Sequence, residues 1–110
     1  MTKAEIFNRY GEELWRQGDF SHAHELLTED YVGHSGLRDR SVAGLLEDIE
    51  LYRAHHPNLH VDVLDQFEVG DKLVTRVRVY SAGKVAHGIN ISRFAEGRIA
   101  EEWAVWTDFE

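Results

Sequence analysis

The second half of the chain alternates apolar and polar residues with a period of two, from Leu59 to Trp106. Three turn signals that contain glycine interrupt this pattern: Gly70-Asp71, Ala82-Gly83 and Glu96-Gly97. A period of two is typical of β-strands with one buried face, and short glycine-containing turns join neighbouring antiparallel strands. The pattern therefore predicts a four-stranded antiparallel meander, with strands over residues 59–68, 73–80, 85–94 and 99–106.

The first half has helical spacing, with apolar residues recurring every three or four positions. Three helices are predicted, over residues 3–17, over residues 20–27, and from Asp39 or Ser41 to His55. Between the second and third helices, Tyr31–His34 is predicted to be a short extended piece that leads into a loop. Pro57 disfavours helical geometry at the residue before it and ends this half. Helices first and strands afterwards are typical of an α+β domain.

Composition limits the class of protein. With 110 residues, of which 43% are apolar, the chain is predicted to form a single domain over residues 1–110. The net charge of −8 disfavours a phosphate-backbone partner, so we expect no nucleic acid. The absence of cysteine excludes disulfides, thiolate metal sites and a cysteine nucleophile. No segment resembles a signal peptide or a membrane span, so the cytoplasm is the expected compartment and no membrane is expected as a partner.

The histidines do not have the spacing of a metal site. His22 and His24 are two apart on a predicted helix and therefore face different directions. His55, His56 and His60 lie on both sides of Pro57, which prevents a helical ligand pair. We expect no metal.

The last predicted strand carries a tryptophan on each face. Under strict alternation Glu101, Trp103 and Val105 share one face with Ile99, and Trp106 lies on the other. Both faces are then at least partly buried, whereas three helices can cover only one side of a four-stranded sheet. A homodimer through the outer sheet face is therefore expected; the alternative is one exposed tryptophan near the chain end.

Several segments together resemble a known superfamily. They are His87–Asn90, the run from Phe94 to Trp103, residues 27–34, residues 45–57 with their closing proline, and Val69–Lys72 before a strand. Their order and spacing resemble the nuclear transport factor 2-like superfamily, and within it the SnoaL-like polyketide cyclase branch, over essentially the whole chain. The resemblance implies a cone-shaped barrel (a cystatin-like roll), in which a curved sheet wraps a pocket that the helices close from the side.

The resemblance also implies site residues. In the cyclase branch His87 and Glu101 would stand at the places of the acid/base pair. Similarity to ketosteroid isomerases puts their oxyanion-stabilising aspartic acid at Asn90 and their catalytic base near His34. This sequence departs from the pattern, because Asn90 carries no acidic proton and Glu101 is one methylene longer than an aspartate. The turn at residues 81–84 is also shorter than the loop that many relatives carry over the pocket mouth.

The residues themselves support these assignments in part. A carboxylate at Glu101 beside Ile99 and Trp103 would be desolvated, which raises its pKa and suits acid/base chemistry; the alternative is a surface charge paired with Arg93 or Arg98.

His87 and Asn90 are three apart, so both reach the pocket only if a bulge intervenes, for which Gly88 is a suitable place. Otherwise His87 is a surface histidine. His34 follows a strand, where it could be catalytic or only structural.

Two functional hypotheses follow. The first is a cofactor-independent cyclase or isomerase acting on a small, apolar, carbonyl-containing ligand. Its catalytic residues would be Glu101, His87 and His34, and its ligand-binding residues Asn90, Trp103, Phe94, Tyr31 and Val105. The second is a non-catalytic ligand-binding or dimeric interaction domain of the same fold.

Overall fold

Local sequence signals determine where the helices begin and end. In the computed structural model, which describes residues 1–36 and 38–110, α1 (Lys3–Tyr10) starts at a capping box in which Thr2 and Glu5 bond each other's backbone N–H. It continues directly into a π-helix, η1 (Gly11–Arg16). A short α2 (Ala23–Leu26) follows. The long α3 (Val42–His55) is capped by Ser41 and ends two residues before Pro57. The three predicted helical segments are confirmed, although the second is shorter than expected.

The predicted meander is confirmed over β3 (His60–Val69), β4 (Lys72–Ser81), β5 (Lys84–Ala95) and β6 (Arg98–Trp106). Each strand pairs antiparallel with the next. Two of the turns have positive φ at both central residues, at 82–83 and 96–97, as the type I′ hairpin requires.

The prediction of four strands is wrong, because the sheet has six, in the order β2-β1-β6-β5-β4-β3. β1 (Leu27–Ser35) runs parallel to β6, and β2 (Arg38–Arg40) pairs antiparallel with β1. A parallel partner is distant in sequence and no tight turn announces it, so the local pattern around Tyr31 indicated only a short extended piece.

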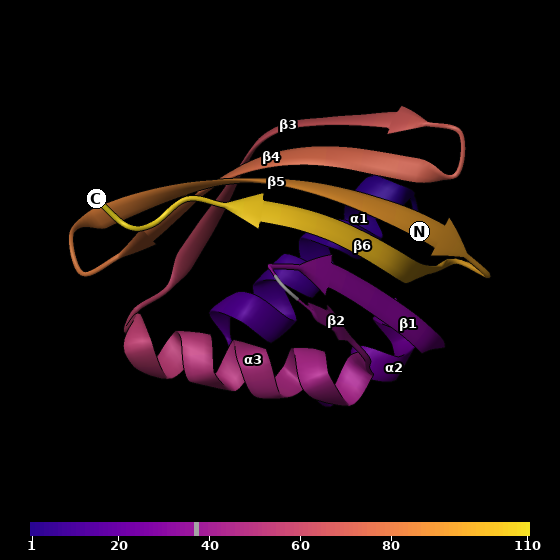
Figure 1. The fold of residues 1–110 in the computed structure, drawn as a ribbon. Helices are drawn as coiled ribbons and strands as arrows, with labels where there is room; N and C mark the ends of the chain where they lie inside the picture. Colours follow the sequence, from indigo (N-terminus) through magenta and orange to yellow (C-terminus); the bar gives the residue numbers. More distant parts are fainter. Residues whose placement is uncertain (37) are drawn as a thin grey trace.

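The helices lie on the inner side of the curved sheet (Figure 1). The main core forms where α1, η1 and α3 meet the inner sheet face, around Leu14, Leu45, Ile49 and Ile99. Among residues 1–36 and 38–110, no helix packs against the outer face of the sheet (Figure 1). Within the described residues, no helix is long and apolar enough to span a membrane.

Candidate functional site

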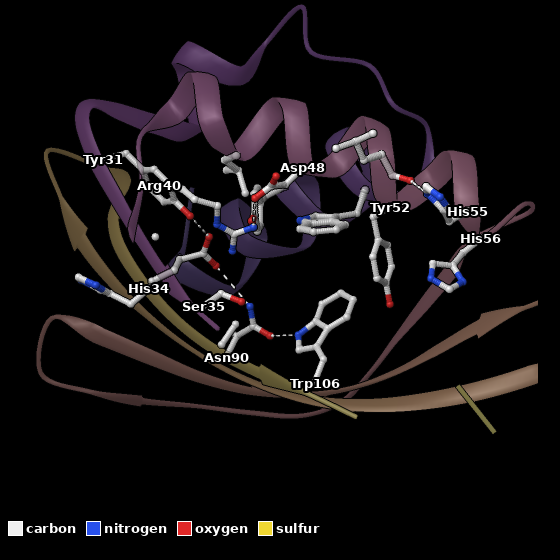
Figure 2. A pocket seen from close by; sticks show the side chains of 17 residues that line it. Tyr31, His34, Ser35, Arg40, Asp48, Tyr52, His55, His56, Asn90 and Trp106 are labelled. Carbon is white, nitrogen blue, oxygen red and sulfur yellow. Dashed lines mark hydrogen bonds and ion pairs between the residues drawn. The ribbon is translucent and has the colours of Figure 1, made fainter. Parts of the chain in front are cut away.

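A cavity of about 420 Å³ lies between the helices and the inner face of the sheet. This volume is within the range of about 300–1,000 Å³ that is usual for small-molecule sites. Its sheet wall carries Tyr31, Asn90, Glu102, Ala104 and Trp106. Its helix wall carries Asp48 and Tyr52 from α3 and Trp15 from η1, and Arg40 reaches the cavity from β2 at the edge of the sheet (Figure 2).

A β-bulge in β6 decides which residues of this strand face the cavity. Arg93 pairs with Glu101, but the next residue, Phe94, pairs with Ile99, so Ala100 is an extra residue in β6. Ile99 and Glu102 therefore share the inner face, which strict alternation from Ile99 could not predict.

The expected positions of Glu101, Trp103 and Val105 in the cavity are consequently wrong. The three side chains lie on the outer face of the sheet. Val105 is 78% exposed. The side of β6 that faces the cavity carries Glu102, Ala104 and Trp106 instead.

Glu102 is the central polar group of the sheet wall. Its side chain is buried, with 3% of the residue exposed. One carboxyl oxygen accepts a hydrogen bond of 2.7 Å from the Tyr31 hydroxyl, and the other lies 3.5 Å from Asn90 Nδ2 and 3.4 Å from Ser92 Oγ. Burial raises the pKa of Glu102, while hydrogen bonds from Tyr31, Tyr10 and Asn90 oppose this shift.

The network continues to Trp106, whose Nε1 donates to Asn90 Oδ1 over 3.1 Å. The asparagine therefore orients both the carboxyl group and the indole. Burial, followed by the charge of Glu102, raises the pKa of Tyr31, so this phenol remains a donor to the carboxyl group. Tyr31 and Asn90 line the cavity, as the sequence led us to expect.

Two glycines make room for this network. A Cβ at Gly88 would lie 2.5 Å from Trp106 Cδ1, and one at Gly33 would lie 2.7 Å from the Tyr31 hydroxyl. No bulge occurs at Gly88, since β4–β5 pairing is regular from residue 84 to residue 93. The glycine is needed for the close approach of the indole and not for a change of face.

Because β5 is regular, His87 points to the outer face and is exposed, so its expected place in the cavity is wrong. Its backbone N–H donates to Thr107 Oγ1 over 2.9 Å. Phe94, expected on the cavity wall, is buried in the main core and does not line the cavity.

His34 is among the residues that line the cavity, but its ring meets Glu101 on the outer side of the sheet. Their Nε2 and Oε2 atoms are 2.6 Å apart, and His34 Nδ1 is 2.7 Å from Asp39 Oδ1. Glu101 also accepts a bond of 3.0 Å from Arg93, and the His34 ring stacks on Trp103. Figure 2 shows the His34 ring turned away from the inner wall.

Hydrogen bonds dominate the electrostatics of this outer cluster. Bonds to Glu101 and Asp39 raise the pKa of His34. The bond to His34, and that to Arg93, lower the pKa of Glu101 although burial opposes them. The two neighbours Glu101 and Glu102 thus have pKa values displaced in opposite directions.

The helix wall is aromatic at one end and charged at the other. Trp15, Tyr52 and Trp106 contact one another with ring centroids 5.2–5.6 Å apart. Burial raises the pKa of Tyr52 to about 12. At the charged end Arg40 Nη1 donates to Asp48 Oδ2 over 2.7 Å, and Asp48 Oδ1 accepts from Arg38 over 3.0 Å.

Sequence reasoning missed Glu102, Arg40, Tyr52 and Trp106 as cavity residues. Glu102 and Trp106 were assigned to the face opposite the ligand because the bulge was not anticipated. Arg40 belongs to a three-residue strand that pairs only with β1. Among residues 1–36 and 38–110, no three potential metal ligands of the His, Cys, Asp or Glu type are gathered in one place.

Comparison with known proteins defines the family. The family model of the SnoaL-like polyketide cyclases matches residues 5–109, and the chain belongs to this family. No curated protein is significantly similar to it in sequence. The predicted α+β fold and superfamily are both confirmed.

Solved structures share the fold. IdmH from Streptomyces antibioticus, a candidate polyketide cyclase, is 22% identical, with 96% of this chain and 92% of that chain covered and a TM-score of 0.83. A candidate polyketide cyclase from Acidithiobacillus ferrooxidans is 20% identical, with 96% and 91% covered and a TM-score of 0.79. AclR from Streptomyces galilaeus, a candidate hydroxylase, is 21% identical, with 96% and 81% covered and a TM-score of 0.76.

Proposed function

We propose that the cavity binds a small, mostly apolar carbonyl compound and that Glu102 transfers a proton to and from it without a cofactor. The observation that carries this proposal is a buried carboxyl group with a raised pKa on the wall of a cavity of ligand size. A carboxylate made more basic by burial is suited to removing a proton from carbon. Membership of a family described as polyketide cyclases supports the same chemistry.

The proton transfers balance within one substrate molecule. The Glu102 carboxylate takes the proton from the carbon next to the carbonyl group, and the C–H electron pair becomes part of the enolate. In an aldol cyclisation the enolate carbon attacks a second carbonyl carbon of the same molecule, and the proton on Glu102 passes to the new alkoxide. In an isomerisation the proton returns to a different carbon. Neither reaction needs an oxidant, a reductant or a second substrate.

The surrounding residues have supporting roles. Tyr31 and Asn90 hold the two oxygens of Glu102 in fixed positions. The hydroxyl of Tyr52, neutral because its pKa is about 12, supplies a donor on the opposite wall for a developing oxygen charge. Trp15 and Trp106 provide apolar surface for the rest of the ligand.

A test does not require the natural substrate. The ketone 2-tetralone is apolar and has exchangeable protons beside its carbonyl group, so its exchange with D₂O, followed by NMR, reports proton abstraction. We expect the protein to accelerate this exchange and Glu102→Gln to slow it by about 100-fold or more. Glu101→Gln is the matched control, because it removes the same charge from the outer face. Equal rates for the wild type and Glu102→Gln would refute the role of Glu102.

The second candidate is a non-catalytic ligand-binding protein. It is favoured by one observation: the carboxyl group of Glu102 is already engaged with Tyr31, Asn90 and Ser92, an arrangement that also suits a purely structural network. In that case 2-tetralone binds, but neither the wild type nor Glu102→Gln accelerates its exchange with D₂O.

We further propose a homodimer formed through the outer sheet face. One paired row on that face consists of Phe67, Val74, Ile91 and Trp103, and the next row contains Ile89 and Val105. Phe67, Ile89 and Val105 are 57%, 52% and 78% exposed, a large apolar surface for a monomer.

Sedimentation should give the mass of two chains. Val105→Asp should reduce this mass to that of one chain. Leu51→Asp should not, although it also replaces an exposed apolar residue by aspartate, because Leu51 lies on α3. A monomeric wild type would rule out this interface.

A further inference from the structure

Arg40 is a cation enclosed in the ligand cavity. Its side chain is 14% exposed, and Arg40 pairs with Gly33 so that it points to the inner side of the sheet. In Figure 2 its guanidinium group lies beside Asp48, across the cavity from Asn90 and Trp106. A buried guanidinium group is unfavourable unless its charge and its five N–H donors find partners.

The partners within the described residues do not satisfy this group. Asp48 accepts one bond from Arg40 Nη1. Arg40 Nε has no acceptor among residues 1–36 and 38–110 and is fully enclosed by protein, so only the Nη groups can meet a ligand. Asp48 is also shared, because Arg38 donates to its other oxygen. Asp48 therefore does not serve Arg40 alone, because it also pairs with the exposed Arg38.

Glu102 lies in the same row of the inner sheet face as Arg40, with Gly33 between them. Within the described part of the chain, Arg40 forms an ion pair with Asp48 and none with Glu102. Apolar and aromatic residues such as Leu45 and Tyr52 occupy the wall beside the guanidinium group. A ligand that brings its own anionic oxygen would therefore complete the site.

We propose that the ligand carries a carboxylate, and that the Nη groups of Arg40, of which Asp48 uses one N–H, bind it. Charge-assisted bonds from arginine to a carboxylate are short and strong, and this end of the cavity is shielded from water. The inference rests on the ligand cavity of the proposed function but not on proton transfer by Glu102. It narrows the substrate class to an apolar ring or chain that has a carbonyl group near Glu102 and an acid group near Arg40.

A matched pair of probes tests the inference. The anion 2-naphthoate and the ketone 2-acetonaphthone have the same ring system and a carbonyl carbon at the same position. The carbonyl carbon bears an anionic oxygen in the naphthoate and a methyl group in the ketone. Binding of each to the full chain is measured by equilibrium dialysis at neutral pH. We expect the wild type to bind the naphthoate about 10-fold or more tightly than the ketone.

Arg40→Met should abolish this preference, so the ratio of the two affinities in the variant should approach one. Arg76→Met is the matched control, since Arg76 lies on the outer face paired with Asp65 and carries the same charge. Asp48→Asn should change the affinity in the opposite direction, with naphthoate binding several-fold more tightly because Arg40 loses its competing partner. If Arg40→Met does not fold, Arg40→Lys and Asp48→Asn still decide the matter.

The outcomes separate the two proposals. A wild type that binds the ketone as tightly as the naphthoate overturns the carboxylate site and leaves the proposed function standing. An equal loss of both probes in folded Arg40→Met, or weaker naphthoate binding by Asp48→Asn, also overturns it by showing that Arg40 is structural. If neither probe binds the wild type, the cavity is not a ligand site and both proposals fail.

Discussion

Replacing Gly88 by alanine tests whether Trp106 is held as tightly against the sheet as the structure indicates. The added Cβ would lie 2.5 Å from Cδ1, 2.7 Å from Nε1 and 2.9 Å from Cγ of the indole. Gly88 does not have positive φ, so alanine is compatible with the backbone and the effect isolates the contact with Trp106. The indole must move toward the cavity, because β5 lies behind it.

The cost follows from three contributions. Overpacking of a rigid ring costs about 1–3 kcal/mol. Displacement of the indole also weakens its 3.1 Å bond to Asn90, a loss of about 0.5–1.5 kcal/mol. The lower entropy of alanine in the unfolded chain offsets about 0.4–1 kcal/mol of this. We therefore expect Gly88→Ala to lower the free energy of unfolding by about 0.5–4 kcal/mol.

Urea denaturation followed by tryptophan fluorescence measures this change. Gly11→Ala is the matched control, because a Cβ there meets no atom within 4 Å and the residue is helical; it should stabilise by about 0.5–1 kcal/mol. In a Trp106→Phe background the cost of Gly88→Ala should fall by about 1 kcal/mol or more, because the smaller ring can move aside. A neutral or stabilising Gly88→Ala would show that Trp106 is not confined, and the same result in both backgrounds would show that the cost lies elsewhere.

Three further predictions concern the polar groups. Glu102 has a folded pKa above its unfolded value near 4.5, so the stability associated with its neutral form is complete below that pH and is lost as the pH rises through the folded pKa. In urea denaturation, the free energy of unfolding of Glu102→Gln should therefore rise relative to that of the wild type from about pH 4 to about pH 8. A difference that stays constant with pH would contradict the raised pKa. Gly33→Ala should displace the Tyr31 hydroxyl from Glu102 and lower the free energy of unfolding by about 1–3 kcal/mol, whereas in Tyr31→Phe the same change should cost less. In an NMR titration, the pKa of His34 should lie above 6.5, and Glu101→Gln should lower this pKa. The stability that the ion pairs of His34 contribute is present below pH 6.5 and is lost as the pH rises through the raised pKa.

The parts of the fold that local patterns determine could be predicted from the sequence. Helix caps at Thr2 and Ser41, the closing Pro57 and the hairpin turns each depend on a few adjacent residues, and all lie where expected. The parallel pairing of β1 with β6 could not be predicted, because it joins Val32 to Glu101 without a turn between them. Tertiary contact alone brings these strands together.

The candidate site was less predictable than the fold. Tyr31 and Asn90 were expected in the cavity and lie there. Asn90 belongs to a regular stretch of β5, whereas Tyr31 lies where the pairing of β1 with β6 shifts register. The face of β6 depends on one extra residue, Ala100, and a shift of one residue exchanges the two faces of a strand. Nothing in the run of residues 98–103 indicates where the extra residue falls.

The paired glutamates show how the fold resolves this ambiguity energetically. Glu101 and Glu102 are adjacent, so one must face the helices and the other the outer side. Glu101 outside is matched to cations, with His34 and Arg93 each bonded to one of its oxygens. Glu102 inside meets neutral donors among the described residues, namely the hydroxyls of Tyr31, Tyr10 and Ser92 and the amide of Asn90.

Neutral donors satisfy the hydrogen bonds of a carboxyl group without cancelling its charge, so burial determines the direction of its pKa shift. The pKa of Glu102 rises while that of Glu101 falls. Two chemically identical side chains that differ in this way divide the roles of acid/base group and permanent ion. It is this divergence, together with the position of Glu102 on the cavity wall, that leads us to propose Glu102 for proton transfer, while Glu101 holds His34 and Arg93 on the outer face.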